Sequence, residues 1–97
     1  MITEVLATGA QNARTGREIC KVLNLSSREL TQAVEIERRK GSPICASVSK
    51  PYGYYLAANQ QEMQAYCRSL HHRAGEIFKT RSVCLEMIDS LPAAEGQ

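Results

Sequence analysis

Apolar residues recur with helical spacing in a short segment near the start of the chain. Ile19, Val22 and Leu23 follow an i, i+3, i+4 pattern, which is typical of a helix with one buried face. Thr15 lies three residues before Glu18, and this spacing predicts a capping box, in which each side chain satisfies the other residue's backbone amide. We therefore expect a helix from the cap at Thr15 to about Leu23.

A second helix is expected after a short turn. Ser26 and Glu29 repeat the capping-box spacing, and the helix should run to about Lys40 and end at Gly41. Its expected inward residues are Leu30, Ala33 and Val34. Two short helices joined by a tight turn form a helix-turn-helix.

Strand-forming residues follow the second helix. Residues 44–48 and 54–56 are rich in β-formers, and residues 49–53 between them are typical of a turn. The pattern predicts a β-hairpin, or wing, directly after the helix-turn-helix. Residues 13–14 are expected to add one short strand. Upstream, residues 2–7 indicate a short helix with Val5 and Leu6 inward, stopped by Gly9.

A longer helical pattern extends from Gln60 to Leu91. Asn59 and Glu62 form a weaker version of the capping pattern, Gly75 is a point at which the helix is expected to weaken, and Pro92 ends it. Apolar residues repeat at alternating spacings of four and three, interrupted once by Arg81. The repeating positions are Met63, Cys67, Leu70, Ala74, Ile77, Arg81, Cys84, Ile88 and Leu91.

The expected fold class is mainly α with a small β-hairpin: a winged helix-turn-helix followed by a long C-terminal amphipathic helix. We expect a winged domain over residues 1–58, the helix over 59–92 and a frayed tail over 93–97. The first turns of the helix, around Met63, Tyr66 and Cys67, are expected to pack on the winged domain. The later turns favour a homodimer, with packing within the chain as the alternative. The predicted dimer seam comprises Leu70, Ile77, Cys84, Ile88 and Leu91.

Charge is distributed unevenly along the 97 residues, although the net charge is only +2. Up to residue 58 there are eight Lys and Arg against five Glu, and afterwards four basic against five acidic residues. The basic first half is weakly indicative of a polyanionic partner. The chain has neither a signal-peptide pattern nor an apolar run that spans a bilayer, so a cytoplasmic location and four free cysteines are expected.

The helix-turn-helix and wing resemble a known family. Residues 15–30 resemble the helix-turn-helix of the biotin-repressor-type winged-helix domain, and residues 41–57 look like its wing, in which a Gly-Tyr pair, here Gly53 and Tyr54, starts the last strand. Small phage and prophage proteins share this design. The resemblance implies a DNA-binding fold for about residues 14–57, without implying biotin chemistry.

A DNA-binding reading assigns roles to the outward side chains of this region. The second helix would enter the major groove, and the first helix and wing would contact phosphates. The predicted base contacts are Ser27, Arg28, Thr31 and Gln32. The predicted phosphate contacts are Arg17, Lys21, Arg38, Arg39, Lys50 and Tyr52. The implied function is a dimeric, sequence-specific regulator of transcription or of phage type.

A protein-binding adaptor is the alternative. Glu29, Glu35 and Glu37 lie on the proposed recognition helix, where three carboxylates near phosphates would repel, and Ile36 lies off the core stripe. Winged helices also serve as protein-protein modules, and such an adaptor would use the long helix for assembly.

Other chemistry has little support in the sequence. Cys67 and His71 share a helix face, but a Cys-x-x-Cys pair is lacking, so no metal site is expected. Cys45 is the thiol to test for redox sensing. Neither a nucleophile signature nor a phosphate-binding glycine loop occurs, so we expect no enzymatic activity, no cofactor and no small-molecule ligand.

Overall fold

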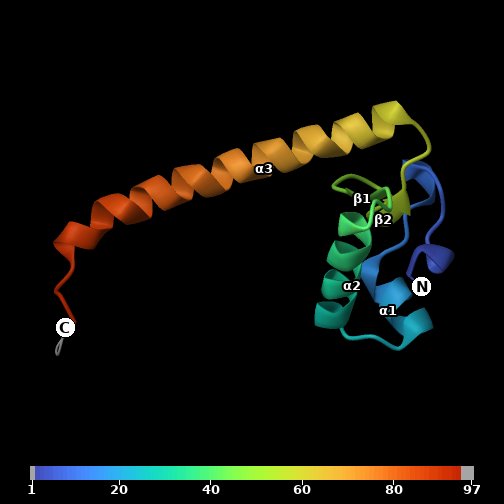
Figure 1. Cartoon of the computed structure of the whole chain (residues 1–97), viewed down its shortest axis with the longest axis horizontal. Coiled ribbons are helices and arrows are strands. Elements are labelled where there is room, and N and C mark those ends of the chain that lie inside the picture. The colour runs from blue at the N-terminus through green and yellow to red at the C-terminus, as the bar shows by residue number, and fades with distance from the viewer. Residues whose placement is uncertain (1, 95–97) are drawn as a thin grey trace. The chain divides into compact units, whose positions relative to one another are not determined.

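The computed structural model describes residues 2–94 and divides the chain into two compact units, Met1–Tyr66 and Cys67–Gln97. The fold class is as expected from the sequence: mainly helical, with one two-stranded antiparallel hairpin and a long C-terminal helix (Figure 1). In chain order the elements are η1 (Ile2–Val5), η2 (Ala10–Asn12), α1 (Gly16–Leu23), α2 (Ser27–Arg39), β1 (Ile44–Ser47), β2 (Gly53–Leu56), α3 (Gln60–Met87) and η3 (Ile88–Ser90). We call Met1–Tyr66 the winged unit.

The turn between α1 and α2 is fixed by backbone geometry and by a cap. Asn24 adopts the left-handed conformation, with φ 55° and ψ 50°, and ends α1. The amide of Leu25 then donates to the carbonyl of Cys20 at 3.0 Å. Ser26 begins α2 with a complete capping box, in which the amide of Glu29 donates to the Ser26 hydroxyl and Glu29 accepts from the Ser26 amide. The predicted helix-turn-helix is confirmed.

The hairpin is the predicted wing, and it is extended on its free edge by the upstream chain. β1 and β2 pair from Ile44 opposite Leu56 to Ser47 opposite Gly53. On the other edge of β2, Arg14 and Tyr54 exchange two backbone hydrogen bonds of 2.8 and 3.0 Å. The short strand expected at residues 13–14 is thus a single bridge at Arg14. The upstream helix is a 3-10 turn, η1, rather than a helix over residues 2–7.

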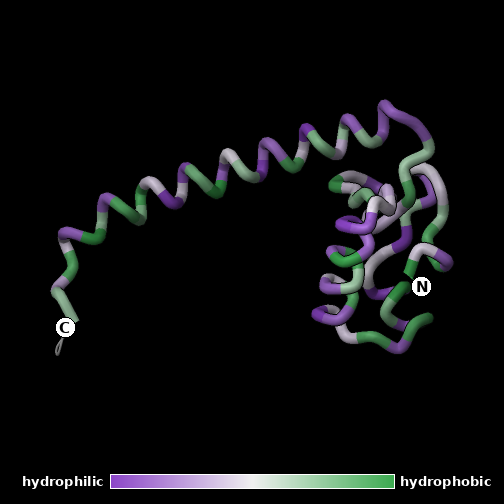
Figure 2. Tube along the Cα trace, viewed as in Figure 1, coloured by the Kyte–Doolittle hydropathy of each residue, from purple (hydrophilic) through white to green (hydrophobic). Residues whose placement is uncertain are grey.

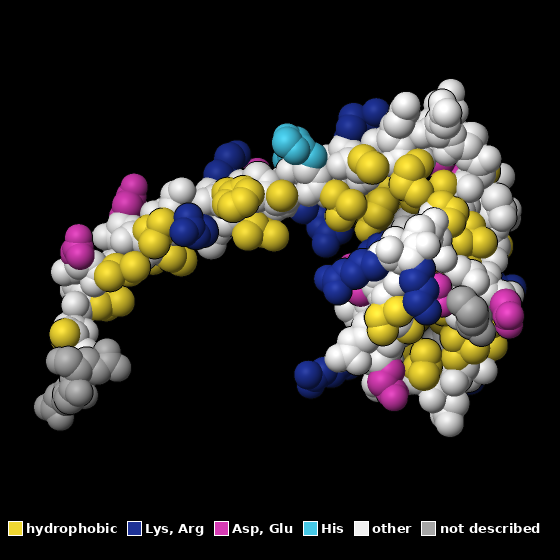
Figure 3. Space-filling view, viewed as in Figure 1, with side chains coloured by type: hydrophobic (Ala, Val, Ile, Leu, Met, Phe, Trp, Pro, Cys, Tyr) yellow, Lys and Arg dark blue, Asp and Glu magenta, His cyan; other side chains and the backbone are white. Residues whose placement is uncertain are grey.

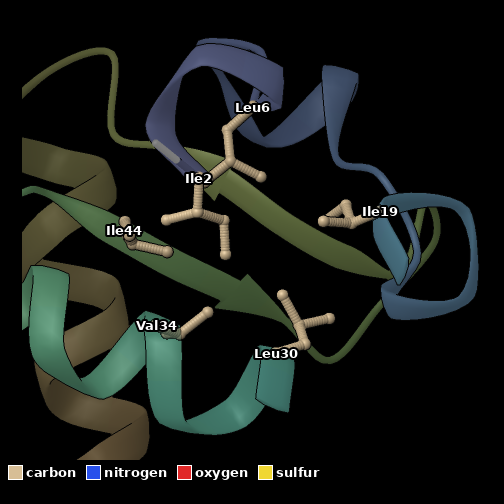
Figure 4. Packing of buried hydrophobic residues seen from close by; sticks show 6 residues of the cluster. All are labelled: Ile2, Leu6, Ile19, Leu30, Val34 and Ile44. Atoms are coloured by element: carbon tan, nitrogen blue, oxygen red, sulfur yellow. The ribbon is translucent and has the colours of Figure 1, made fainter. Parts of the chain in front are cut away.

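The main core lies between the two helices, the hairpin and η1. Figure 4 shows six side chains from these elements pointing toward one another: Ile2, Leu6, Ile19, Leu30, Val34 and Ile44. Ala33, expected to point inward, packs at the edge of this core, as does Val5. The prediction that Val22 belongs to the buried face of α1 is wrong, because this side chain is 62% exposed. Because α1 faces the core along Ile19, Cys20 and Leu23, Val22 points to solvent.

A second cluster attaches the start of α3 to the winged unit. Cys45, Tyr55 and Tyr66 are buried together, with Met63 packed against them. Glu62 was expected to cap the amide of Asn59. The first half of the predicted cap is present, since the amide of Glu62 donates to the Asn59 side chain at 2.9 Å. The carboxylate of Glu62 instead accepts from the amides of Ala10 and Ala58, at 2.9 and 2.8 Å, and these donors hold the pKa of Glu62 below its usual value.

The boundary between the two units lies inside α3, after Tyr66, rather than before the helix at residue 58. Tyr66 is buried as expected, whereas Cys67 is exposed and does not join the winged unit. The reason is helical geometry: Met63 and Tyr66 share the side of α3 that faces the hairpin cluster, and Cys67 lies beyond it. The winged unit therefore includes the first two turns of α3.

From Cys67 to Met87 the residues of α3 are exposed, except Ser69 and Gly75, which are partly buried. The helix continues unbroken through Gly75, contrary to the weakening expected there, and gives way to η3 after Met87. Apolar and polar residues alternate turn by turn along it (Figure 2), and hydrophobic side chains gather along one side of its C-terminal half (Figure 3). No helix within residues 2–94 is long and apolar enough to cross a membrane. Most of the tail expected over residues 93–97 lies outside the described residues.

Candidate nucleic-acid interface

The outward face of α2 contains the four polar side chains that were predicted from the sequence to contact bases. Ser27, Arg28, Thr31 and Gln32 are all exposed. Arg28 and Gln32 lie one helical turn apart, so their side chains neighbour each other on the surface. The Thr31 hydroxyl donates to the carbonyl of Ser27 at 3.0 Å and keeps its lone pairs available. Within residues 2–94, neither Arg28 nor Gln32 makes a hydrogen bond or ion pair.

Two of the three carboxylates on α2 are engaged at the surface. Glu29 accepts from the Ser26 amide at 2.9 Å, and this backbone donor together with the Ser26 hydroxyl lowers its pKa. Glu35 lies 3.5 Å from a guanidinium nitrogen of Arg38 and 3.7 Å from one of Arg39. Glu29 is thus held by neutral donors, whereas the charge of Glu35 is partly offset by two arginines.

The third carboxylate does not reach the outward face. Glu37 is only 7% exposed, and it accepts a long hydrogen bond of 3.5 Å from the hydroxyl of Ser42, in the connection to β1. On the helix, residue 37 follows Leu30 and Val34 at spacings of seven and three, so it falls on the inward stripe. The sequence pattern contains this signal, but Glu37 is charged and was therefore grouped with the exposed acids.

Arg38 was predicted to contact a phosphate, but in the structure its side chain points inward. Its Nε donates to the carbonyl of Ile44 at 3.0 Å, and its Cζ lies 5.0 Å from the centre of the Tyr66 ring, a cation–π arrangement. Its Nη2 is buried and has no hydrogen-bond partner within the described residues. This placement makes Arg38 a link between α2, β1 and the start of α3. Arg39, one residue on, is well exposed.

A hollow of about 360 Å³ lies between the N-terminal turns of α1 and α2. Arg17, Ser27 and Thr31 supply charged and hydroxyl groups to its wall, beside Tyr54 from β2. Amides at the first turn of a helix favour an anion, and Arg17 adds a full positive charge. Lys21, one turn further along α1, is also exposed. Tyr54 was not nominated from the sequence, because only the fold brings β2 beside α1.

The tip of the wing is exposed. Lys50 and Tyr52 lie in the turn between β1 and β2, where they were expected, and Tyr52 is half exposed. The turn is bridged by the Ser47 hydroxyl, which donates to the carbonyl of Ser49 at 2.6 Å. Within residues 2–94, Lys50 has no ion-pair partner.

Ile36 is the apolar member of the outward face. It is 54% exposed and lies one turn after Gln32 and three residues before Arg39. Sequence spacing had already placed it off the core stripe, without a role. The structure sets it among the polar side chains of the candidate interface.

The cysteines and histidines do not assemble into a site in the described part of the chain. Cys45, nominated for redox sensing, is completely buried, whereas Cys67 and Cys84 are exposed on α3. No group of three metal-ligating side chains occurs within residues 2–94. Comparison of the chain with protein families, with curated proteins and with solved structures gives no match in any of the three.

Proposed function

We propose that the winged unit binds double-stranded DNA in a sequence-specific way, with α2 in the major groove and the wing over the backbone. The observation that carries this proposal is which charged and polar side chains of α2 have partners within the fold and which have none. Arg28 and Gln32 are exposed and without a partner in residues 2–94, while Glu29, Glu35 and Glu37 are each engaged within the fold. The charge of Glu35 is partly offset by Arg38 and Arg39, and Glu37 is buried away from the outward face.

The base contacts follow from side-chain chemistry. An arginine donates two hydrogen bonds to the O6 and N7 atoms of guanine, and a glutamine pairs with the N6 and N7 atoms of adenine. Arg28 and Gln32 take these roles, with Ser27 and Thr31 beside them at the N-terminal end of α2. Ile36 offers an apolar surface to the 5-methyl group of thymine.

The proposed phosphate contacts surround the outward face of α2 that contacts the bases. The hollow beside Arg17 accepts one backbone phosphate, with Lys21 following on α1. Arg39 at the end of α2, and Lys50 and Tyr52 at the wing tip, contact others. Arg38 is left out, because its guanidinium is held against Ile44 and Tyr66.

The C-terminal part of α3 supplies the second half of the proposal, a homodimer. Most of its exposed apolar side chains form one stripe, with Val83 off it, and pairing with a second copy covers the stripe on both chains. Two winged units then engage two half-sites, as dimeric DNA-binding proteins do. The function proposed is that of a regulator of transcription in a cell or a phage, acting in the cytoplasm.

Binding to random and selected duplex DNA tests this function. Affinity for random DNA is expected to fall steeply as salt rises, because phosphate contacts release counterions. Arg28→Ala should relax the sequence preference, whereas Lys50→Ala should weaken binding to all sequences alike. Failure to bind duplex DNA even at low salt contradicts the proposal and leaves the protein-binding adaptor as the explanation of the exposed Ile36.

A further inference from the structure

The exposed part of α3 carries a stripe of apolar side chains with one charge in the middle. We define the seam as the stripe formed by Leu70, Ala74, Ile77, Arg81, Cys84, Ile88 and Leu91. All its members are exposed, with Ile77 at 67% and Leu91 at 66%, and Phe78 and Leu85 widen it on one side. Arg81 interrupts the seam between Ile77 and Cys84, and it makes no ion pair within residues 2–94.

Charge along the same stretch is polarised from one end to the other. Residues 67–81 contain Arg68, Arg73, Lys79 and Arg81 against the single acid Glu76, which lies 3.2 Å from Lys79. Residues 82–94 contain Glu86 and Asp89 and no basic residue. One end of the exposed helix is thus positive and the other negative.

We propose that the seam pairs with the seam of a second copy in an antiparallel orientation. This inference rests on the proposed homodimer and specifies its geometry. A parallel, in-register pair places identical residues in one layer, so the two Arg81 guanidinium groups would meet inside an apolar interface. It would also set the positive halves of both helices side by side. The antiparallel pair sets the positive half of each helix beside the negative half of the other. It also moves the two Arg81 side chains out of one shared layer into adjacent layers, and it aligns the two helix dipoles favourably.

The heptad positions define a register for this pair. In this register Ile77 lies against Ile88 of the second copy, and Ala74 lies against its Leu91. The numbers of two opposing residues therefore always add to 165. The same register sets Arg81 against the second copy's Cys84, a small side chain that leaves room for a long one. A large side chain therefore faces a small one in the outer layer, at Ala74 and Leu91, and in the central layer, at Arg81 and Cys84, while two isoleucines meet between them. The ends of the helices that lead into the two winged units lie at opposite ends of the pair.

Cysteine cross-linking tests the orientation directly. The background for the test is the full chain with Cys20→Ser, Cys67→Ser and Cys84→Ser, in which the buried Cys45 is kept. Two variants are then made in this background, one with Ile77→Cys and one with Ile88→Cys. One of the two variants carries a tag. Positions 77 and 88 are 11 residues, about 16 Å, apart along a helix. Antiparallel pairing predicts that mild oxidation cross-links only the mixture of the two variants, as a tagged–untagged heterodimer. Cross-linking of either variant alone overturns the proposal in favour of a parallel pair.

Arg81 is expected to set the orientation, and its replacement gives a second measurement. Arg81→Leu should tighten dimerisation roughly tenfold or more, because a leucine is buried in place of a charge. It should also raise the cross-linking of the Ile77→Cys variant alone, since the part of the penalty on the parallel pair that comes from Arg81 is gone. Persistence of the heterodimer-only pattern would show that Arg81 does not control orientation and would contradict that part of the inference.

Light scattering of the unmodified chain separates this inference from the proposed function. A monomer at high concentration removes the homodimer itself, whereas a dimer that cross-links in neither arrangement overturns only the orientation and register. DNA binding by the winged unit is measured independently, with the random duplexes described above.

Discussion

Two regions of the molecule contain similar apolar residues at helical spacing, but the structure treats them in opposite ways. In the winged unit, Ile19 is 1% exposed, inside a core closed by two helices, a hairpin and η1. In the C-terminal part of α3, Ile77 is 67% exposed and belongs to a stripe that nothing in residues 2–94 covers. The first pattern is satisfied within the chain. The second is left open to solvent, and a second copy is the surface that we propose for it.

The largest difference is expected when the two isoleucines are exchanged for the same small residue. Ile19→Ala should lower the free energy of unfolding by about 2–5 kcal/mol, because it opens a cavity in the main core. Ile77→Ala should change the unfolding of the dilute, monomeric chain by less than about 0.5 kcal/mol. Urea denaturation followed by circular dichroism measures both. Equal losses for the two variants would show that the seam is covered within the chain.

Two glycines test how the winged unit closes at the hairpin. Gly53 has φ +124°, and a Cβ there would overlap the carbonyl of Arg14, which accepts from the Tyr54 amide. Gly41 has φ +101° but faces open space. Gly41→Ala should cost only its backbone strain, about 1 kcal/mol, whereas Gly53→Ala should cost at least about 2 kcal/mol because the bridge to Arg14 must move as well. The same urea titration compares them, and a smaller loss at Gly53 would contradict the bridge.

The features that local sequence determines were predictable. The N-caps at Thr15 and Ser26, the end of α2 before Gly41, and the hairpin all follow from residue types at fixed spacing, and the structure has them. At Thr15 only half of the predicted capping box forms, because the Glu18 carboxylate accepts from the Thr15 hydroxyl and not from its amide. Local rules work here because the atoms involved are only a few residues apart.

The features that depend on distant segments were not predictable. The carboxylate of Glu62 accepts from Ala10, 52 residues away, and Arg38 turns inward because Tyr66 and Ile44 offer it a ring and a carbonyl. Periodicity alone cannot rank Val22 against Cys20 for the inner face of α1, since both lie near its edge. At the candidate interface, the exposure of Arg28 and Gln32 follows from the α2 pattern, and so does the inward position of Glu37.

Acid should weaken the attachment of α3 to the hairpin cluster through Glu62. The pKa of Glu62 is lowered in the folded chain by the amides of Ala10 and Ala58, so its ionised form stabilises the fold at pH values above its ordinary pKa of 4.5. This contribution is lost as the pH falls below 4.5 through the folded value. Glu62→Gln should therefore reduce stability at neutral pH and flatten the decline below pH 4.5. Glu86→Gln, in the exposed part of α3, is the matched control and should leave the acid profile, followed by circular dichroism, unchanged.

The smallest expected effect distinguishes two exposed isoleucines, Ile36 on α2 and Ile77 on α3. If Ile36 contacts a thymine methyl group, replacing that thymine with uracil in the selected duplex should weaken binding by about 0.8 kcal/mol, the value of one buried methyl group. Ile36→Ala should weaken binding to the thymine duplex and abolish this difference, so that the double-mutant cycle shows coupling. Ile77→Ala should keep the full thymine–uracil difference while weakening dimerisation. If the thymine–uracil difference were lost in Ile77→Ala and kept in Ile36→Ala, the two faces would have exchanged roles. The DNA would then lie on the seam, and the face of α2 would be left for a second copy.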